Sequence, residues 1–209
     1  SSNLTSPAVL AWKFTYGEGL KNGSQVSAGD VTGDGQDDLV VWNRDRNPNV
    51  QVLTFNDATN ALDQVAYVFP YGEMGINMGA DLVLADIDGD EDKDIVTVPT
   101  GGRTIANIQV YAYTTASDGS QTGIRRNMKR LTWIQAYQEQ TAGTFNLASG
   151  DINNDGDDEI VIAPYAGLGG QVMTYDYYNN RLNLIASIFP YGKDYAGGVH
   201  VALGDFDSD

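Results

Sequence analysis

Three acidic nine-residue loops, each followed at once by an apolar strand, constrain this chain more than any other feature. They begin at Asp30, Asp86 and Asp151, and a fourth copy begins at Asp205. The copies lie about 55 to 65 residues apart, a period typical of repeat architectures. Each loop carries oxygen-bearing side chains at alternate positions, and several inward-facing acids repel one another unless a cation lies between them. The spacing therefore predicts one structural unit per loop and a metal ion in each loop.

Two further markers recur with the loops. An aromatic-glycine turn precedes three of them and is replaced by Ala136–Gln138 in the third repeat, and an alternating stretch follows the three complete loops. The turns are Phe14–Gly17, Phe69–Gly72 and Phe189–Gly192; the alternating stretches are Val50–Phe55, Ile108–Tyr113 and Gly170–Tyr175. Short stretches rich in β-branched and aromatic residues, bounded by Gly, Asn and Asp, predict strands rather than helices.

Each repeat then contains four short strands. One runs into the loop, as at Asp81–Ala85 and Val199–Leu203, one leaves it, the third is the alternating stretch, and the fourth leads to the next turn. Four strands repeated at this period predict a β-propeller blade. We expect an all-β chain of about three and a half four-stranded antiparallel blades, forming part of a larger propeller or assembly. Residues 1–209 are one region, with repeats at 9–66, 67–130, 131–186 and, incomplete, 187–209.

Calcium is the cation that the loops predict, because Ca²⁺ takes six to eight oxygen ligands in a flexible geometry. Side chains at loop positions 1, 3, 5 and 9 and the backbone carbonyl at position 7 supply such ligands. The predicted ligands are Asp30, Thr32, Asp34, Gln36 and Asp38; Asp86, Asp88, Asp90, Asp92 and Asp94; Asp151, Asn153, Asp155, Asp157 and Glu159; and, in the incomplete copy, Asp205, Asp207 and Asp209.

Two other divalent-ion sites fit less well. An EF-hand needs a Glu at position 12, where this chain has Val41, Thr97 and Ile162, and Mg²⁺ needs a smaller octahedral site. Position 6 calls for positive φ, which Gly35 and Gly156 allow. Glu91 occupies that position in the second loop, so that loop is expected either to be strained there or to turn differently.

Charge and composition exclude several partners. The net charge is −16, with 12 Lys and Arg against 28 Asp and Glu, so we expect no nucleic-acid partner. There are no cysteines, which excludes disulfides and thiolate metal sites. No apolar run approaches the roughly 20 residues of a membrane span, so we expect no membrane insertion.

The loops resemble FG-GAP repeats, also called VCBS repeats, which form the blades of the integrin α-subunit propeller and of many microbial surface proteins. Gly29–Gly35 with Asp38–Val41, and Gly150–Gly156 with Glu159–Pro164, carry the resemblance. Trp42–Asn43 departs from the family's Ala-Pro element. The resemblance implies an extracellular or cell-surface, calcium-rigidified propeller used in adhesion or structural assembly. Its partners would be calcium, a protein or glycan, and other copies of itself or the rest of a longer chain.

Two other functions stay open at this point. Tyr177, Tyr178, Tyr191 and Tyr195 could stack on sugars in a lectin-like propeller. A polysaccharide-degrading propeller would need paired carboxylates outside the loops. His200 is the single histidine and no nucleophile motif accompanies it, so we predict no catalytic residues.

The third repeat period is lengthened by residues 114–130, which end in basic residues; these predict a solvated hairpin tip or a partner-binding loop.

Overall fold

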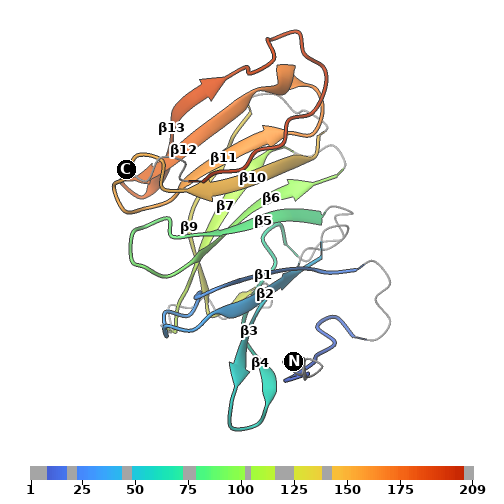
Figure 1. Cartoon of the computed structure of the whole chain (residues 1–209), viewed down its shortest axis with the longest axis vertical. Helices are drawn as coiled ribbons and strands as arrows, with labels where there is room; N and C mark the ends of the chain where they lie inside the picture. The colour runs from blue at the N-terminus through green and yellow to red at the C-terminus, as the bar shows by residue number, and fades with distance from the viewer. Residues whose placement is uncertain are drawn as a thin grey trace, which may run out of the picture.

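The computed structural model describes residues 9–17, 23–43, 49–72, 79–101, 105–115, 125–137 and 143–204, and in these ranges it is built from three antiparallel sheets (Figure 1). Sheet 1 contains β1 (Gln25–Gly29), β2 (Asp38–Trp42), β3 (Val50–Asn56), β4 (Ala61–Val68) and β8 (Arg125–Arg126). Sheet 2 contains β5 (Gly79–Ala85), β6 (Asp94–Thr100), β7 (Asn107–Tyr113) and β9 (Met128–Gln135). Sheet 3 contains β10 (Phe145–Gly150), β11 (Glu159–Pro164), β12 (Val172–Tyr178) and β13 (Arg181–Ile188). The expectation of an all-β chain of antiparallel sheets is confirmed.

The second strand of each sheet is largely buried, and after its first, acidic residue it is mostly apolar. Every residue of β6 and of β11 is buried. A strand covered on both faces reads as a continuous hydrophobic run rather than as an alternating one. A short 3-10 turn, η1 (Leu168–Gly170), lies between β11 and β12.

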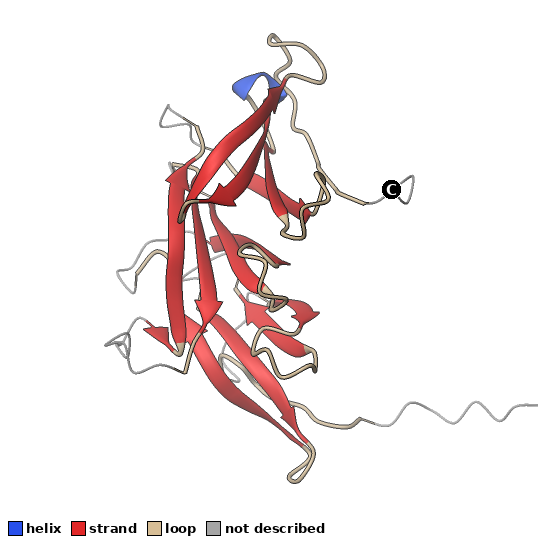
Figure 2. Cartoon of the chain, turned by 90° about the vertical axis from the view of Figure 1, so that its left-hand side faces the viewer, coloured by secondary structure: helices blue, strands red, loops and turns tan. Residues whose placement is uncertain are grey.

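The sheets follow one another along the long axis of the molecule, in chain order, with a core between each pair (Figures 1 and 2). Val40, Val52 and Val68 of sheet 1 pack with Leu82 and Ile95 of sheet 2. A second cluster joins sheets 2 and 3. A third and smaller cluster forms where residues 199–203 pack on sheet 3. The sheets stack face to face because each sheet has apolar side chains that must be buried against its neighbour.

A tyrosine in the segment before each sheet is hydrogen-bonded to that sheet. The Tyr16 hydroxyl donates to the carbonyl of Val41 at 3.0 Å, and the Tyr71 hydroxyl contacts Thr97 Oγ1 at 3.0 Å and the carbonyl of Asn107 at 3.2 Å. The equivalent bonds in sheet 3 come from Tyr137, to the carbonyls of Ile162 (3.4 Å) and Gln171 (2.7 Å). Tyr137 belongs to the segment that replaces the aromatic-glycine turn, so the third repeat keeps the contact without the motif. We call this hydrogen bonding the tyrosine contact.

Some segments differ from the sequence-based expectation. Arg125 and Arg126 form β8, which pairs with Val68 and Tyr67 of β4, rather than a solvated hairpin tip. Residues 199–203, expected as a strand, pair with no sheet among the described residues, and neither do residues 9–14, which precede the first aromatic-glycine turn. The expected repeat bounds at 66, 130 and 186 fall inside β4, β9 and β13, because each sheet ends with its fourth strand. In the described part of the chain, no helix is both long and apolar enough to cross a membrane.

Candidate functional site

The three complete acidic loops occupy the same place in their sheets, between the first and second strands. The first loop (residues 30–38) joins β1 to β2, the second (86–94) joins β5 to β6, and the third (151–159) joins β10 to β11. Each starts directly after the last residue of one strand and finishes on the first residue of the next. The fourth set of predicted ligands, Asp205, Asp207 and Asp209, lies outside the described residues.

The aspartate at position 1 folds the loop around its own carboxylate. In the second loop, Asp86 Oδ1 accepts the backbone N–H groups of Gly89 (2.9 Å) and Asp90 (3.1 Å), and Oδ2 accepts that of Glu91 (3.0 Å). The same three bonds are 2.8, 3.2 and 2.7 Å long at Asp30 and 2.7, 3.3 and 3.0 Å long at Asp151. Three donated N–H groups fix the position of this carboxylate within the loop.

The carboxylate at position 9 lies under the loop and is buried in all three copies, at Asp38, Asp94 and Glu159. Each accepts the backbone N–H of position 2: from Val31 at 3.1 Å, from Ile87 at 3.3 Å and from Ile152 at 2.8 Å. A buried carboxylate needs hydrogen-bond donors or a cation to offset its lost hydration.

Position 5 completes the shared pattern. Its carboxylate accepts the N–H of position 7, over 2.9 Å at Asp34, 3.1 Å at Asp90 and 3.3 Å at Asp155. This bond turns the position-7 residue back toward the loop. The three loops therefore share one hydrogen-bond scheme despite differing at most side chains.

The expected left-handed residue at position 6 is confirmed, with φ of 83° at Gly35, 99° at Gly156 and 72° at Glu91. Glu91 keeps the turn of the other loops, so its Cβ costs on the order of 1–2 kcal/mol of strain. The second loop thus adopts the common fold in spite of its sequence.

Two loops bring three carboxylates together. Asp86, Asp88 and Asp90 each offer an oxygen within 4.8 Å of the others, and Asp155, Asp157 and Glu159 do the same in the third loop. The third loop therefore presents the side chain of Asp157, where the sequence analysis assigned its backbone carbonyl.

Further oxygens in the loops fit a cation. In the described part of the chain, Thr32 Oγ1 is buried without a hydrogen-bond partner, and so is Asp157 Oδ1. Buried oxygens without a donor are uncommon in native proteins. Thr32 is a predicted ligand, and Asp157 belongs to the third carboxylate cluster. A bound cation would satisfy both atoms.

Crowding makes these carboxyl groups hard to ionise. Burial, followed by the charge of Asp88, raises the pKa of Asp94 to about 8. Burial and the neighbouring Asp155 raise the pKa of Asp157 to about 7. The pKa of Asp88 is raised by burial and then by Asp90 and Asp86. A divalent cation among these groups would reverse the shifts by stabilising the ionised forms.

In the first and third loops a residue outside the loop also acts on the position-9 carboxylate, and the sequence analysis did not assign it this role. Thr54 Oγ1 of β3 donates to Asp38 Oδ1 at 2.6 Å. In sheet 3, Ile160 pairs with Tyr175, so the adjacent Asp176 of β12 lies beside Glu159. Burial raises the pKa of Glu159, and the charges of Asp155 and Asp176 raise it further. Thr54 is the fifth residue of its alternating stretch, whereas Asp176 directly follows the stretch Gly170–Tyr175, and the second stretch has Ala112 where the first has Thr54.

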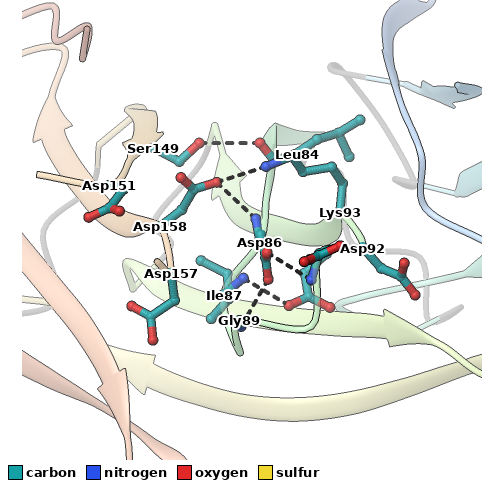
Figure 3. A network of polar contacts seen from close by, with 12 residues as sticks. Leu84, Asp86, Ile87, Gly89, Asp92, Lys93, Ser149, Asp151, Asp157 and Asp158 are labelled. Atoms are coloured by element: carbon teal, nitrogen blue, oxygen red, sulfur yellow. Dashed lines mark hydrogen bonds and ion pairs between the residues drawn. The ribbon is translucent and has the colours of Figure 1, made fainter. Parts of the chain in front are cut away.

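The residue at position 8 links the second and third loops each to the loop of the preceding sheet. The sequence analysis did not predict this link. Lys93 N–H donates to the carbonyl of Asp30, and Asp158 N–H donates to the carbonyl of Asp86, both at 2.6 Å. Figure 3 shows the Asp158 carboxylate between the two loops, where it accepts the N–H of Asp86 at 2.9 Å and pairs with Lys93 Nζ at 3.2 Å. Adjacent loops are therefore joined by backbone hydrogen bonds. The accepting carbonyl belongs in each case to a position-1 aspartate, Asp30 or Asp86, whose side chain is a predicted metal ligand.

Comparison with protein families places a known repeat on the first of these loops. Residues 22–50 match the FG-GAP repeat model, a range that contains β1, the first acidic loop and β2. The chain contains an FG-GAP repeat. The resemblance drawn from the acidic loops is thereby confirmed, and the second and third loops share the hydrogen-bond scheme of the FG-GAP loop. No curated protein matches the chain.

Proposed function

We propose that the chain is a calcium-binding β-propeller module in which each sheet is a blade and each acidic loop holds one Ca²⁺. The observation that carries the proposal is the common hydrogen-bond scheme of the three loops, which gathers carboxylates within 4.8 Å of one another in two of them. Hard oxygen ligands in this number suit Ca²⁺ better than Mg²⁺, which keeps most of its water.

The chain's own residues have distinct tasks in this proposal. The position-1 carboxylate, held by three N–H groups, shapes the loop and faces the ion, as at Asp86. The position-9 carboxylate, as at Asp94, supplies a buried negative charge beneath the ion. The ion offsets the repulsion between these groups and joins the first two strands of each blade. Its role is to stiffen the blade.

The module acts without catalysis, as an adhesion or structural element outside the cell. Extracellular calcium is abundant enough to fill modules that bind it with dissociation constants of about 10⁻⁴–10⁻³ M. His200, the single histidine, packs edge-on against Tyr165 with ring centroids 4.7 Å apart, a packing role rather than a chemical one. The carboxylates that gather in the described residues lie in the loops, where a structural ion accounts for them.

Calcium titration of the chain and two variants tests the proposal. Asp90→Ala removes a member of the second carboxylate cluster, so calorimetry should find one bound Ca²⁺ fewer than in the parent chain. Asp57→Ala, at an exposed turn between β3 and β4, is the matched control and should leave the stoichiometry unchanged. An Asp90→Ala chain that binds as many calcium ions as the parent would refute the assignment, as would equal affinity for Mg²⁺.

A further inference from the structure

Asp158 of the third loop is hydrogen-bonded to both backbone groups of Asp86 in the second loop. Its N–H donates to the carbonyl of Asp86 at 2.6 Å, and its carboxylate accepts the N–H of Asp86 at 2.9 Å (Figure 3). Asp86 is the position-1 aspartate of its loop, and Asp158 lies between Asp157 and Glu159, two predicted ligands of the third loop. While these bonds hold, a change in the backbone at either residue displaces a ligand of the other loop.

The link between the first and second loops has fewer bonds. Lys93, the position-8 residue of the second loop, donates its backbone N–H to the carbonyl of Asp30 at 2.6 Å, but its ammonium group is a donor only and cannot accept a bond in return. That group pairs with Asp158 at 3.2 Å instead. In the described part of the chain, Asp158 therefore makes the most extensive link between two loops.

The side chains at position 7 also lie against the loop of the preceding sheet. The carboxylate of Asp92 sits so close to Gly33, at position 4 of the first loop, that no Cβ atom would fit there. Asp157 lies beside Gly89, at position 4 of the second loop, with its Cβ 3.8 Å from the place of a Cβ on that glycine. The shape of each of these loops therefore depends on the order of its neighbour.

Binding at the second loop would lower the cost of ordering the third. A cation that draws Asp86, Asp88 and Asp90 together fixes the backbone of Asp86, and with it both hydrogen bonds to Asp158. When a first ligand orders a segment that a second site also needs, the second ligand binds more tightly because less conformational entropy is left to lose. Repulsion between the two cations acts in the opposite direction and is weakened by salt.

We infer that the acidic loops bind calcium with positive cooperativity, and that Asp158 couples the second loop to the third through its two bonds to Asp86. The inference rests on the proposed function, since it needs an ion in each loop. Asp158 is a positioning residue and not a predicted ligand. Occupation of the second loop should raise the calcium affinity of the third by on the order of 5- to 150-fold, the range of coupled sites. The two loops then fill together over a narrow range of calcium concentration.

Calcium titrations followed at one backbone amide in each loop test this inference. The amides of Gly35, Glu91 and Gly156 each donate to the position-1 carboxylate of their own loop, so their nuclear magnetic resonance signals report the three loops separately. Asp90→Ala removes a predicted ligand of the second loop and should raise the calcium concentration at the Gly156 midpoint at least about fivefold. Asp34→Ala removes the equivalent ligand of the first loop and should change that midpoint by less than about twofold.

Substitution of Asp158 tests its part in the coupling. Asp158→Ala removes the carboxylate bonds to the second loop and keeps every predicted ligand. In this background, Asp90→Ala should change the Gly156 midpoint by less than about twofold. The matched control is Asp37→Ala, because Asp37 is the exposed position-8 aspartate of the first loop and has no preceding loop among the described residues. It removes the same charge and should leave the coupling of the second and third loops unchanged.

Three results would overturn the inference. The first is a Gly156 midpoint that is equal in Asp90→Ala and the parent chain. The second is a midpoint that falls in Asp90→Ala, which would show net repulsion between the ions. The third is coupling that persists undiminished in Asp158→Ala; the first two comparisons do not depend on the folding of this variant. Loops that titrate independently would leave the proposed function standing, whereas a parent chain whose loop amides do not respond to calcium would refute that function.

Discussion

Replacement of Asp94 by Asn should change stability in opposite directions with and without calcium. Asp94 is buried at position 9 of the second loop, where burial and the charge of Asp88 raise its pKa from the usual 3.8 to about 8. In the unfolded chain the carboxyl group ionises freely, but in the folded, calcium-free protein at pH 7 it is held largely protonated. At pH 7 the chain therefore has to bind a proton when it folds, and this protonation costs free energy.

The size of the effect follows from the two pKa values. The pKa of Asp94 is 3.8 in the unfolded chain and about 8 in the folded chain. At pH 7 this difference lowers the free energy of unfolding by on the order of 4 kcal/mol. Because the folded state binds the extra proton, calcium-free stability falls as pH rises from about 4 to about 8. Asp157, whose pKa is raised to about 7, acts in the same direction. Asn at position 94 carries no charge to bury and keeps an oxygen for the N–H of Ile87.

Urea unfolding at pH 5 and pH 7, in EDTA and in millimolar calcium, measures the effect. In EDTA at pH 7, Asp94→Asn should be more stable than the parent chain by on the order of 2–4 kcal/mol, with a smaller gain at pH 5. In calcium it should be less stable, because the parent ligand is a charged oxygen that the ion holds ionised. A variant that is destabilised in EDTA, or equally affected with and without calcium, would refute the reasoning.

Three further predictions concern contacts within and between sheets, each measured by urea unfolding. Tyr71→Phe should cost about 1–2 kcal/mol, because it removes the part-buried hydrogen bonds from this hydroxyl to the carbonyl of Asn107 and to Thr97 Oγ1; a loss no larger than that of Tyr191→Phe in the same chain would contradict this. Glu91→Gly should stabilise the calcium-free protein by up to about 1 kcal/mol by relieving the positive φ, and a loss of stability would argue against strain there. Asp158→Ala should cost about 1–3 kcal/mol, since its carboxylate bonds the Asp86 N–H, whereas Lys93→Ala removes a half-exposed ion pair worth under about 1 kcal/mol; the reverse order would show that the ion pair dominates.

Much of the fold could be predicted because its signals are short in sequence. The strands that leave the loops, such as Leu39–Val41 in β2, read as apolar runs and form the buried second strands. The aromatic-glycine turns predicted where a new sheet begins, and Tyr16 and Tyr71 of these turns make the tyrosine contact with the sheet that follows. Where a pattern was missing, prediction failed: Tyr137 makes the same contact without the turn motif.

Pairing between distant segments was harder to foresee. The basic residues Arg125 and Arg126 could be placed on a loop from their charge, but they add a fifth strand to sheet 1 by pairing with Tyr67 and Val68. An edge strand accepts any extended neighbour that presents free backbone groups, and charge does not report which neighbour arrives. Residues 9–14 have the composition of a strand but pair with no strand among the described residues; Lys13 Nζ donates to the carbonyl of Leu62 at 2.8 Å.

The sequence by itself determined the acidic loops, because the groups that shape each loop lie within nine residues of one another. An aspartate at position 1 meets N–H groups three to five residues later, so residue type and spacing suffice to predict the turn. Tertiary structure alone decided how the loops join and which face stays open. The bond from Asp158 to Asp86 spans two sheets, and the exposure of Ile152 depends on a neighbouring sheet. Such contacts depend on how sheets stack, and residue order within one repeat does not encode it.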